Sequence, residues 1–261
     1  MQNLLFKINN LSFSISGKPI LRELRFDILQ GDYLAVIGPN GAGKTTLLKC
    51  LMGIYHCEPG QIMFNNVPLA DIKQKELARK VAYVPQNDGR PLPFTVKEFV
   101  MLARYPHLSP FTSYSSDDKS IVYEALENVG INRLQNRRLN TLSGGERQMV
   151  LIAAALAQQS QIILFDEPTA FLDPKYEAAI YGIMDKIHRS GKTIVTVTHD
   201  INGAILHSTK LIIIKQGKLV FEGKPQTITS GSILKEVYDK SFSFMKHPQS
   251  GKLIIVPGAL V

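Results

Sequence analysis

The sequence contains no hydrophobic run long enough to cross a membrane. Its longest uninterrupted apolar stretch, Met149 to Ala157, has nine residues, whereas a membrane-spanning helix needs about 20. At the N-terminus no basic stretch is followed by a long apolar core, so no signal peptide is visible. We therefore expect a cytoplasmic protein that depends on another chain for any passage through a bilayer.

Cysteine is nearly absent. Cys50 and Cys57 are the only two in the sequence, and no further metal ligands stand near them at the spacing of a metal site. A reducing compartment suits them as ordinary thiols. We expect Cys50 to lie in the core.

The sequence also lacks a basic run with interleaved aromatic residues, which is typical of nucleic-acid binding. Its 30 Lys and Arg against 22 Asp and Glu give a net charge of +8, which suits nucleic acid, an anionic membrane surface or an anionic small molecule. Arg133, Arg137 and Arg138 come nearest to a cluster, and we interpret them as a solvated helix end. The 261 residues show no repeat, low-complexity tract or flexible linker, and they can form one large domain or two lobes.

What the sequence does contain is the phosphate-binding pattern G-x-x-x-x-G-K-[ST], matched at every fixed position. The stretch comprises Gly38, Pro39, Asn40, Gly41, Ala42, Gly43, Lys44, Thr45 and Thr46. It follows the apolar run Tyr33 to Ile37 and precedes a helix-compatible stretch, as the motif requires. Its backbone N–H groups and the positive end of the helix dipole would surround a polyphosphate. Lys44 would reach the β and γ phosphates, and the Thr45 hydroxyl would ligate a bridging magnesium ion.

The other strand and helix signals predict an α/β fold. Alternating apolar positions in Leu4 to Phe13 and Leu24 to Ile28 predict antiparallel strands. Residues 87–157 show helical periodicity, with a helix start at Thr95 and an exposed loop over Pro106 to Asp118. Further strands are expected at Gln61 to Phe64, Val81 to Val84, Ile162 to Phe165, Thr193 to Val197, Leu211 to Lys215 and Lys218 to Phe221. Helices near 73–79, 174–189 and 200–207 alternate with these strands, which implies a parallel sheet with crossovers.

Two carboxylates, Asp166 and Glu167, follow a run of four apolar residues. Ligands of open α/β sheets gather at the carboxyl ends of strands. Because Lys44 lies upstream, we assign Asp166 to the magnesium ion and Glu167 to the attacking water, which it would orient and deprotonate as general base. Paired acids can also simply begin a helix, but the phosphate loop favours the chemical interpretation.

A second anion site is predicted at residues 142–148, which read LSGGERQ. The Ser143 hydroxyl and the N–H groups of Gly144 and Gly145 would meet a γ-phosphate at the start of a helix, with Glu146 next in the motif. A helix cap alone would explain Ser143 but not both glycines. With this motif the chain resembles, over essentially its whole length, the ATP-binding subunits of ABC transporters.

The resemblance implies the α/β fold of the P-loop NTPases, with a RecA-like parallel core sheet, an antiparallel β subdomain and a helical signature subdomain. Residues 1–86 and 159–261 would form the core, the β subdomain and a C-terminal extension, and residues 87–158 the helical subdomain. Gln86 would bind the magnesium ion and sense the γ-phosphate, and His199 would contact the γ-phosphate. Asp173 would lie in the loop that communicates across a dimer, where Ala170 replaces the usual serine.

In the family, the phosphate loop of one copy faces the signature motif of another. Since this chain has one of each, the resemblance implies a homodimer in which each ATP lies between Lys44 of one copy and Ser143 of the other. It also implies integral-membrane permease subunits, an extracytoplasmic binding protein, no nucleic-acid partner and a peripheral location on the cytoplasmic face of the inner membrane.

Three departures from the family pattern stand out. Ile15 falls where an aromatic residue usually stacks on adenine, and Phe13 or Tyr33 could substitute for it. Met149 and Ala154 replace two frequent arginines of the signature helix. We interpret both as tolerated structural changes, with weaker anchoring of that helix as the alternative.

Residues 103–111, ARYPHLSPF, are similar to the GRYPH stretch in importers of iron–siderophore complexes, haem and cobalamin, and the tail His247 to Pro257 is similar to the end of those ATPases. We therefore expect an ATPase that energises metal-chelate uptake, rather than amino-acid, sugar or export systems. Alternatives are an importer of a free metal ion or another small solute, or a soluble ABC ATPase acting on ribosomes or DNA. A P-loop kinase or GTPase is disfavoured by the Ser143 motif.

Overall fold

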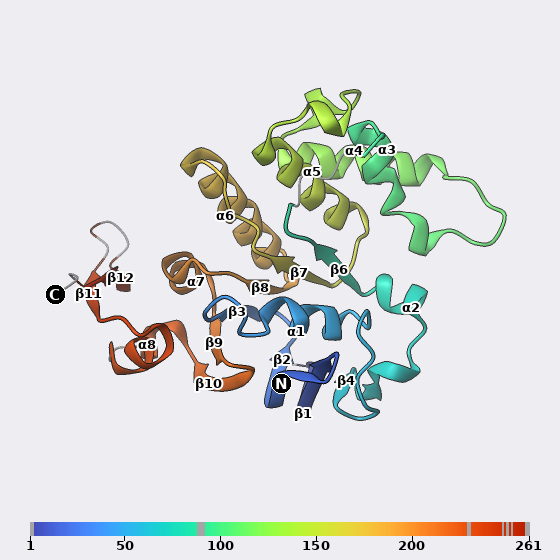
Figure 1. Ribbon diagram of the computed structural model, residues 1–261. Coiled ribbons are helices and arrows are strands. Elements are labelled where there is room, and N and C mark those ends of the chain that lie inside the picture. Colours follow the sequence, from blue (N-terminus) through green and yellow to red (C-terminus); the bar gives the residue numbers. More distant parts are fainter. Residues whose placement is uncertain are drawn as a thin grey trace. The chain divides into compact units, whose positions relative to one another are not determined.

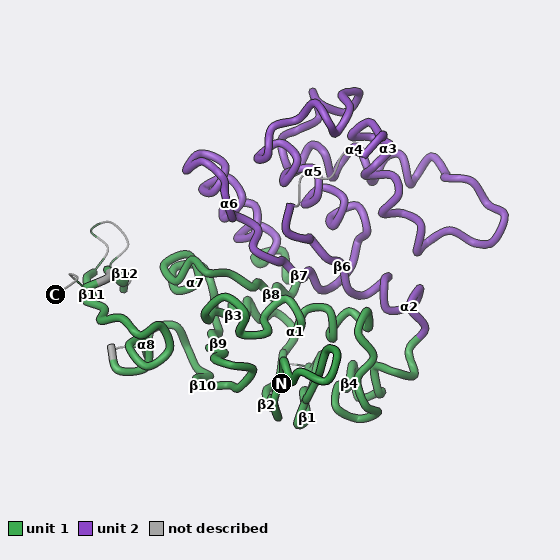
Figure 2. Tube along the Cα trace, viewed as in Figure 1, with its two compact units in different colours: residues 1–72, 188–261 green, residues 73–187 purple. Residues whose placement is uncertain are grey.

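The computed structural model describes residues 3–87, 92–228, 231–246, 248, 251 and 253–258. The chain divides into two compact units, one of residues 1–72 and 188–261 and the other of residues 73–187 (Figure 2). No helix in these described ranges combines the length and the apolar character that crossing a membrane requires. The finer division at residues 86/87 and 158/159, which the resemblance implies, stays a prediction.

The first unit contains an antiparallel sheet with strand order β2–β1–β4–β5 (Figure 1). Its strands are β1 (Leu4–Ile15), β2 (Lys18–Leu29), β4 (Ile62–Phe64) and β5 (Val67–Pro68). The expected antiparallel strands are thus confirmed. Both are longer than the apolar alternation predicts, because β1 and β2 stay paired as far as Ile15 and Lys18, beside their connecting turn.

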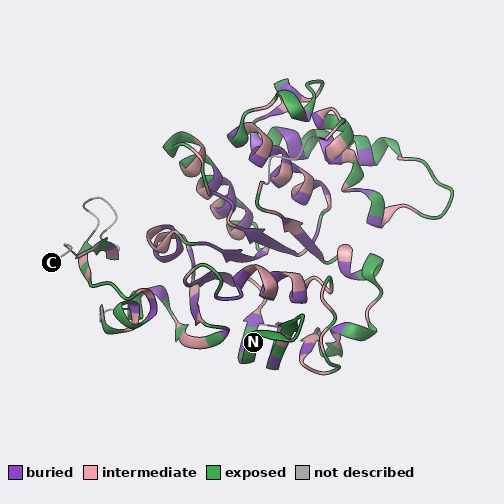
Figure 3. Cartoon of the chain, viewed as in Figure 1, coloured by how far each residue is buried: buried purple, intermediate pink, exposed green. Residues whose placement is uncertain are grey.

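The same unit contains the strands β10 (Lys218–Gly223), β9 (Lys210–Lys215), β3 (Tyr33–Ile37) and β8 (Thr193–Val197), which are neighbours in that order. β3 runs parallel to both β8 and β9, which confirms the expected parallel sheet. Every residue of β3 and β8 is buried (Figure 3). This is the pattern of a parallel strand covered on both faces.

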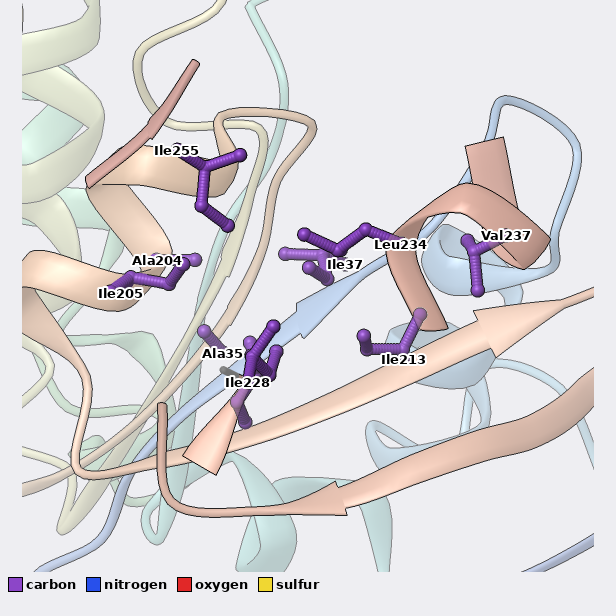
Figure 4. Close-up of a cluster of buried hydrophobic side chains, with 10 residues drawn as sticks. Ala35, Ile37, Ala204, Ile205, Ile213, Ile228, Leu234, Val237 and Ile255 are labelled. Atoms are coloured by element: carbon purple, nitrogen blue, oxygen red, sulfur yellow. The ribbon is translucent and has the colours of Figure 1, made fainter. Parts of the chain in front are cut away.

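Three helices and a hairpin complete the first unit: α1 (Lys44–Leu51), α7 (Ile201–His207), α8 (Gly231–Tyr238), β11 (Phe242–Lys246) and β12 (Leu253–Pro257). Helices α7 and α8 and the hairpin share a core with β3 in which Ile37, Ile205, Leu234 and Ile255 meet (Figure 4). The side chain of Asn202 on α7 accepts from the N–H of Ile255 (2.7 Å) and donates to its carbonyl (2.9 Å). We predicted neither α8 nor the hairpin, and positions 247, 249–250 and 252 of the tail lie outside the described residues.

The second unit pairs the parallel strands β6 (Val81–Val84) and β7 (Ile162–Asp166) and is otherwise helical among its described residues. Its helices are α2 (Gln74–Ala78), α3 (Val96–Leu102), α4 (Ser116–Val129), α5 (Gly144–Ala157) and α6 (Pro174–Arg189). Helices α3, α4 and α5 each begin with a capping box, which confirms the helix start expected at Thr95. The helical character expected over 87–157 is confirmed for its described part.

The exposed loop expected over Pro106 to Asp118 is wrong at both ends. Pro106 is buried in a short 3₁₀ turn, and α4 already begins at Ser116. Asp118 is buried because its carboxylate accepts hydrogen bonds from Arg104 and from the backbone of Ser115. The Ser and Thr residues that suggested a loop include the N-cap of this helix, Ser115.

Candidate active site

The phosphate loop connects β3 to α1 in the first unit. At Gly38 (φ 152°) a Cβ atom would stand 2.0 Å from the carbonyl oxygen of Ile214, so only glycine lets the loop pass β9. The Lys44 side chain, 7% exposed, curls back into the loop. Its Nζ donates to the carbonyls of Gly38 (2.8 Å) and Pro39 (3.2 Å). The loop therefore holds a positive charge at the N-terminus of α1.

His199 follows the strand next to β3. Val36 pairs with Val197 in the parallel register, and the N–H of Thr198 donates to the carbonyl of Val36 (3.1 Å). Asp200 then caps α7 by accepting from the N–H of Gly203 (2.9 Å). The exposed His199 thus leaves the same edge of the sheet as the phosphate loop.

In the second unit, Asp166 is the buried last residue of β7. The hydroxyl of Tyr83, on the neighbouring strand β6, donates to Asp166 Oδ2 (2.9 Å). Burial, and then the charge of Asp166, raises the pKa of Tyr83, so its hydroxyl keeps the proton it donates. We did not predict Tyr83, because its only sequence signal is its place in a short buried strand.

Glu167 and Gln86 leave this pair of strands at the same edge. Val84 pairs with Phe165, and Gln86 and Glu167 each follow two residues later. Glu167 has a left-handed backbone (φ 48°), which is uncommon outside glycine and turns its side chain sharply from the strand direction. Gln86, Asp166 and Glu167, which we assigned to the magnesium ion and the attacking water, are therefore neighbours in this unit.

Ser143 is the N-cap of α5. Its hydroxyl accepts from the N–H of Glu146 (3.2 Å), and Glu146 Oε2 accepts from the N–H of Ser143 (3.0 Å). Arg137 lies 3.8 Å from the other carboxylate oxygen of Glu146. The glutamate of the motif therefore has a local structural role, and its contact with ATP stays a prediction.

The second glycine of the motif makes room for a ring. A Cβ atom on Gly145 would stand 2.4 Å from two ring atoms of Tyr176, whereas at Gly144 the nearest atom, on Leu172, would be 3.8 Å away. Asp173 caps α6 by accepting from the N–H groups of Lys175 (3.0 Å) and Tyr176 (3.1 Å). The starts of α5 and α6 are thus packed together through Gly145 and Tyr176.

Asn87 connects this region to the strand ends. Its side-chain amide donates to the carbonyl of Gly144 (3.2 Å), directly after Gln86. Asn87 therefore links the strand end at Gln86 to the start of α5. We did not predict a role for Asn87, although its position directly after the predicted site residue Gln86 could have indicated one.

The two apolar departures in the signature helix have a structural explanation. Met149 is buried and Ala154 is half-buried on α5. An arginine at Met149 would need a partner for a buried charge. The burial of Met149 and the partial burial of Ala154 support our interpretation that both replacements are tolerated structural changes.

The two aromatic residues that could replace Ile15 as the adenine stack, Tyr33 and Phe13, both pack against other rings. Tyr33 is fully buried in β3, edge-on to His188, so the proposal that it stacks on adenine is wrong. Phe13 already stacks on Tyr55, with ring centroids 4.9 Å apart and planes 15° apart. Ile15, at the end of β1, is 42% exposed.

The stretch ARYPHLSPF holds the far end of α5. Arg104 is buried and donates to Asp118 Oδ1 (2.8 Å), to the carbonyl of Ala157 (2.8 Å) and to Gln159 Oε1 (2.9 Å). His107 Nε2 lies 2.8 Å from the carbonyl of Gln158. These side chains satisfy carbonyls that a helix C-terminus leaves without intrahelical partners. The motif that suggested the cargo class is thus a clamp on the signature helix.

Replacing Asp118 with asparagine should lower the free energy of unfolding by about 2 kcal/mol at neutral pH, because Arg104 would keep a buried charge without its partner. Hydrogen bonds from Arg104 and from the backbone of Ser115 lower the pKa of Asp118 from 3.8 to about 2. A lowered carboxyl pKa stabilises the fold above the ordinary pKa, and that stability disappears as the pH falls toward 2.

Urea denaturation should therefore show a difference between wild type and Asp118→Asn that is constant above about pH 5 and shrinks between about pH 4 and 2. Asp117→Asn, at an exposed neighbour, is the control and should change little. An equal loss at every pH would contradict the role of the carboxylate charge.

The family model for the ABC transporter matches residues 21–170, more than half of the chain. The ferric enterobactin transport ATP-binding protein FepC of Escherichia coli (strain K12) is 34% identical, covering 91% of this chain and 88% of its own. The hemin import ATP-binding protein HmuV of Streptomyces coelicolor (strain ATCC BAA-471 / A3(2) / M145) is 32% identical, covering 95% and 88%.

Two solved structures are similar over most of their length. One, described as a metal-chelate type ABC transporter in an inward-facing conformation, superposes with a TM-score of 0.85 at 27% identity and covers 98% of each chain. The other, the dimeric ATP-binding cassette MJ0796 bound to ADP and Pi, gives a TM-score of 0.74 at 29% identity and covers 85% of this chain and 99% of its own. Both support the α/β fold predicted from the sequence.

Proposed function

This chain belongs to the ABC transporter family as an ATP-hydrolysing subunit, and we propose that it energises import of a metal chelate through a separate permease. The observation that carries the proposal is the combination, in one chain, of a phosphate loop before α1 and a second glycine-bearing helix start at Ser143. The names of relatives that transport ferric enterobactin or hemin support the cargo class.

We assign the β and γ phosphates of ATP to the loop 38–46. The Lys44 ammonium is bonded to two neutral carbonyls of the loop. Phosphate oxygens form stronger, charge-assisted hydrogen bonds. Binding of ATP therefore redirects the ammonium, and the N-terminus of α1 adds its own attraction for negative charge.

The residues assigned to magnesium fit that ion. The Thr45 hydroxyl, the Gln86 amide oxygen and the Asp166 carboxylate are hard oxygen donors, which Mg²⁺ prefers. Tyr83 fixes one oxygen of Asp166 and so orients the carboxylate. When bound with ATP, the ion offsets charge on the phosphate oxygens.

Hydrolysis needs a base and a group that responds to the γ-phosphate. We assign the base to Glu167, whose left-handed backbone sets its direction at the end of β7. It would accept a proton from the attacking water. His199, exposed at the end of β8, would donate a hydrogen bond to the γ-phosphate.

Replacing Ile15 with tyrosine should tighten ATP binding, because a ring at this exposed strand end would supply the adenine stack that the chain lacks. A fluorescent ATP analogue displaced by ATP measures the affinity. Val67→Tyr, at a similarly exposed aliphatic residue on β5, is the matched control and should leave affinity unchanged. A loss of ATP binding in Ile15→Tyr would mean that the adenine lies elsewhere.

A homodimer follows from the count of motifs. One chain carries one phosphate loop and one Ser143 motif, and two copies would supply two complete ATP sites, with Lys44 and Ser143 from different copies. Phe171, two residues before Asp173, is 95% exposed and would be covered by a second copy. The dimeric cassette MJ0796 supports this arrangement.

A groove in the second unit is our candidate contact for the permease. It has a volume of about 250 Å³ and begins at Gln86. Its walls are mostly apolar and include Leu92, Phe99, Val150 and Leu151. An apolar groove of this size suits a short amphipathic segment of the permease. Such docking would keep the chain peripheral, on the cytoplasmic face of the membrane.

ATPase activity in a reconstituted complex tests the proposal. The chain, its copurifying permease and ATP are combined in proteoliposomes with binding proteins loaded with iron–siderophore, haem or cobalamin. We expect stimulation by one of these and none by amino-acid- or sugar-loaded proteins, with a Glu167→Gln complex as the blank. If only the amino-acid- or sugar-loaded binding proteins stimulated the ATPase, the proposed cargo class would be wrong. Copurification with ribosomes or DNA instead of a membrane protein would favour the soluble-ATPase alternative.

A further inference from the structure

His199 lies between two anchors, the end of a strand and the start of a helix. Before it, the N–H of Thr198 donates to the carbonyl of Val36 (3.1 Å), which holds the chain to β3. After it, Asp200 accepts from the N–H of Gly203 (2.9 Å) as the N-cap of α7 and donates its own N–H to the Thr198 hydroxyl (3.0 Å). The direction in which the exposed His199 leaves the sheet therefore depends on where the first turn of α7 lies.

α7 is a weak helix by itself. It has seven residues, and Gly203 lies in its interior, where glycine disfavours a helix. Helices this short are marginal without tertiary contacts. The chain after α7 is tied to the sheet, because the N–H of Thr209 donates to the carbonyl of Tyr33 (2.9 Å). The position of the first turn, at the other end of the helix, therefore depends on what packs against it.

Asn202, in that first turn, bonds to the C-terminal hairpin. Its amide nitrogen donates to the carbonyl of Ile255 (2.9 Å), and its amide oxygen accepts from the N–H of the same residue (2.7 Å). In the hairpin Ile255 is opposite Phe244. An antiparallel strand directs both backbone groups of every second residue away from its partner strand. Asn202 therefore occupies the free edge of β12 at this residue, as a further strand would.

The hairpin can hold α7 because it is itself packed against the sheet. Ile255 is 3% exposed and shares a core with Ile37 of β3 and Ala204 of α7 (Figure 4). The partly buried Phe244 packs against the same core. Ile37 is the residue directly before the phosphate loop at Gly38. The hairpin thus rests on the strand that supports the phosphate loop.

We propose that Asn202 is a positioning residue for His199, and that it acts by fixing the first turn of α7 to the C-terminal hairpin. The inference rests on the proposed function, because that function assigns His199 to the γ-phosphate. The Asn202 side chain is engaged with Ile255, so it acts through the histidine and not on ATP. Its loss therefore slows hydrolysis and leaves ATP binding by the loop 38–46 intact.

The chemistry of the anchor selects the test variant. A side-chain amide serves both backbone groups of Ile255 at once. Aspartate has the same shape, but it has no donor for the carbonyl and would bring a negative charge beside that oxygen. Asn202→Asp therefore disturbs the anchor without changing the packed volume. Asn9→Asp is the matched control, because the Asn9 amide also donates to a distant backbone carbonyl of this unit, that of Gly60 (3.2 Å).

Steady-state ATP hydrolysis by the full chain tests the role of Asn202. Asn202→Asp should lower kcat about tenfold, the rate equivalent of one lost hydrogen bond. Displacement of a fluorescent analogue should give an ATP affinity close to that of wild type, and Asn9→Asp should leave both quantities unchanged. A wild-type kcat in Asn202→Asp, or an equal loss in Asn9→Asp, would overturn the inference.

A double variant shows whether Asn202 acts through His199. His199→Ala should lower kcat about 100-fold, the scale for a lost donor to the reacting group, and adding Asn202→Asp should cost nothing further. A further loss of about tenfold would mean that Asn202 has only a general structural role, and the inference would be wrong. A wild-type rate in His199→Ala would instead show that the proposed function assigns this histidine wrongly, and the positioning role would fail with it.

Hydrogen exchange measured by mass spectrometry tests the anchor independently of ATP. In Asn202→Asp the amides of α7 and β12 should exchange faster than in wild type, whereas those of β3 and α1 should keep their protection. This pattern separates a displaced first turn from global unfolding, in which all four elements would lose protection. Unchanged protection of α7 and β12 would show that the hairpin does not hold the helix.

Discussion

Replacing Glu167 with glutamine is expected to lower ATP hydrolysis by about 100-fold or more, the usual scale for a lost general base. Glutamine has nearly the same shape but cannot accept the proton of the attacking water. It should fit the left-handed backbone position as well as glutamate does. Phosphate release at saturating Mg²⁺ and ATP measures the loss.

ATP binding should survive this change, because the phosphate loop and α1 are untouched. Displacement of a fluorescent analogue should give an affinity close to that of wild type. Glu177→Gln, in the first turn of α6, removes another carboxylate of the same unit and should leave turnover intact. If Glu167→Gln turned over at the wild-type rate, another residue would have to be the base.

Replacing Gly145 with alanine should lower the free energy of unfolding by about 3 kcal/mol, the upper part of the range for overpacking. The added methyl group would stand 2.4 Å from Cγ and Cδ2 of Tyr176. These atoms are at the base of the ring, so a small movement of the ring tip does not relieve the clash. The starts of α5 and α6 would have to separate, and ATPase activity should fall with the displaced Ser143.

Gly144→Ala is the matched control, because its nearest contact would be an ordinary 3.8 Å. Chemical denaturation should find this variant at least as stable as wild type, since alanine favours helix over glycine. Combining Gly145→Ala with Tyr176→Ala should cost less than the sum of the two single changes. Strict additivity would mean that the ring is not the obstacle.

Glu167 and Gly145 differ in how much of their role could be predicted from the sequence. Glu167 could be predicted because its signals are local: a buried strand, two acids and an upstream phosphate loop. Gly145 was predicted for its N–H group, but the contact that excludes a side chain comes from Tyr176, which is far along the chain. No local pattern encodes that meeting.

The same contrast holds for the stretch ARYPHLSPF. Its residues suggested a family of importers, yet nothing local indicates that Arg104 and His107 hold the end of α5. Our prediction of an exposed loop that included Asp118 was wrong for the same reason. Asp118 is buried because its partner, Arg104, lies on another element. Burial of a charge depends on a partner that sequence spacing alone does not identify.

The C-terminal elements lie at the limit of prediction. α8 and the β11–β12 hairpin are held by a shared core with β3 and by Asn202. The surfaces they pack on belong to β3 and α7, so their structure depends on elements that are distant in the chain. Tyr33 failed as an adenine partner because β3 is covered on both faces.

The sequence by itself determined the phosphate loop, the strands around it, the acidic pair and the family, because each depends on residues close together in the chain. The tertiary structure alone decided which side chains meet across elements: Tyr83 with Asp166, Tyr176 with Gly145, Arg104 with Asp118. Local patterns fix backbone conformation and chemistry, whereas packing between distant segments fixes the partners.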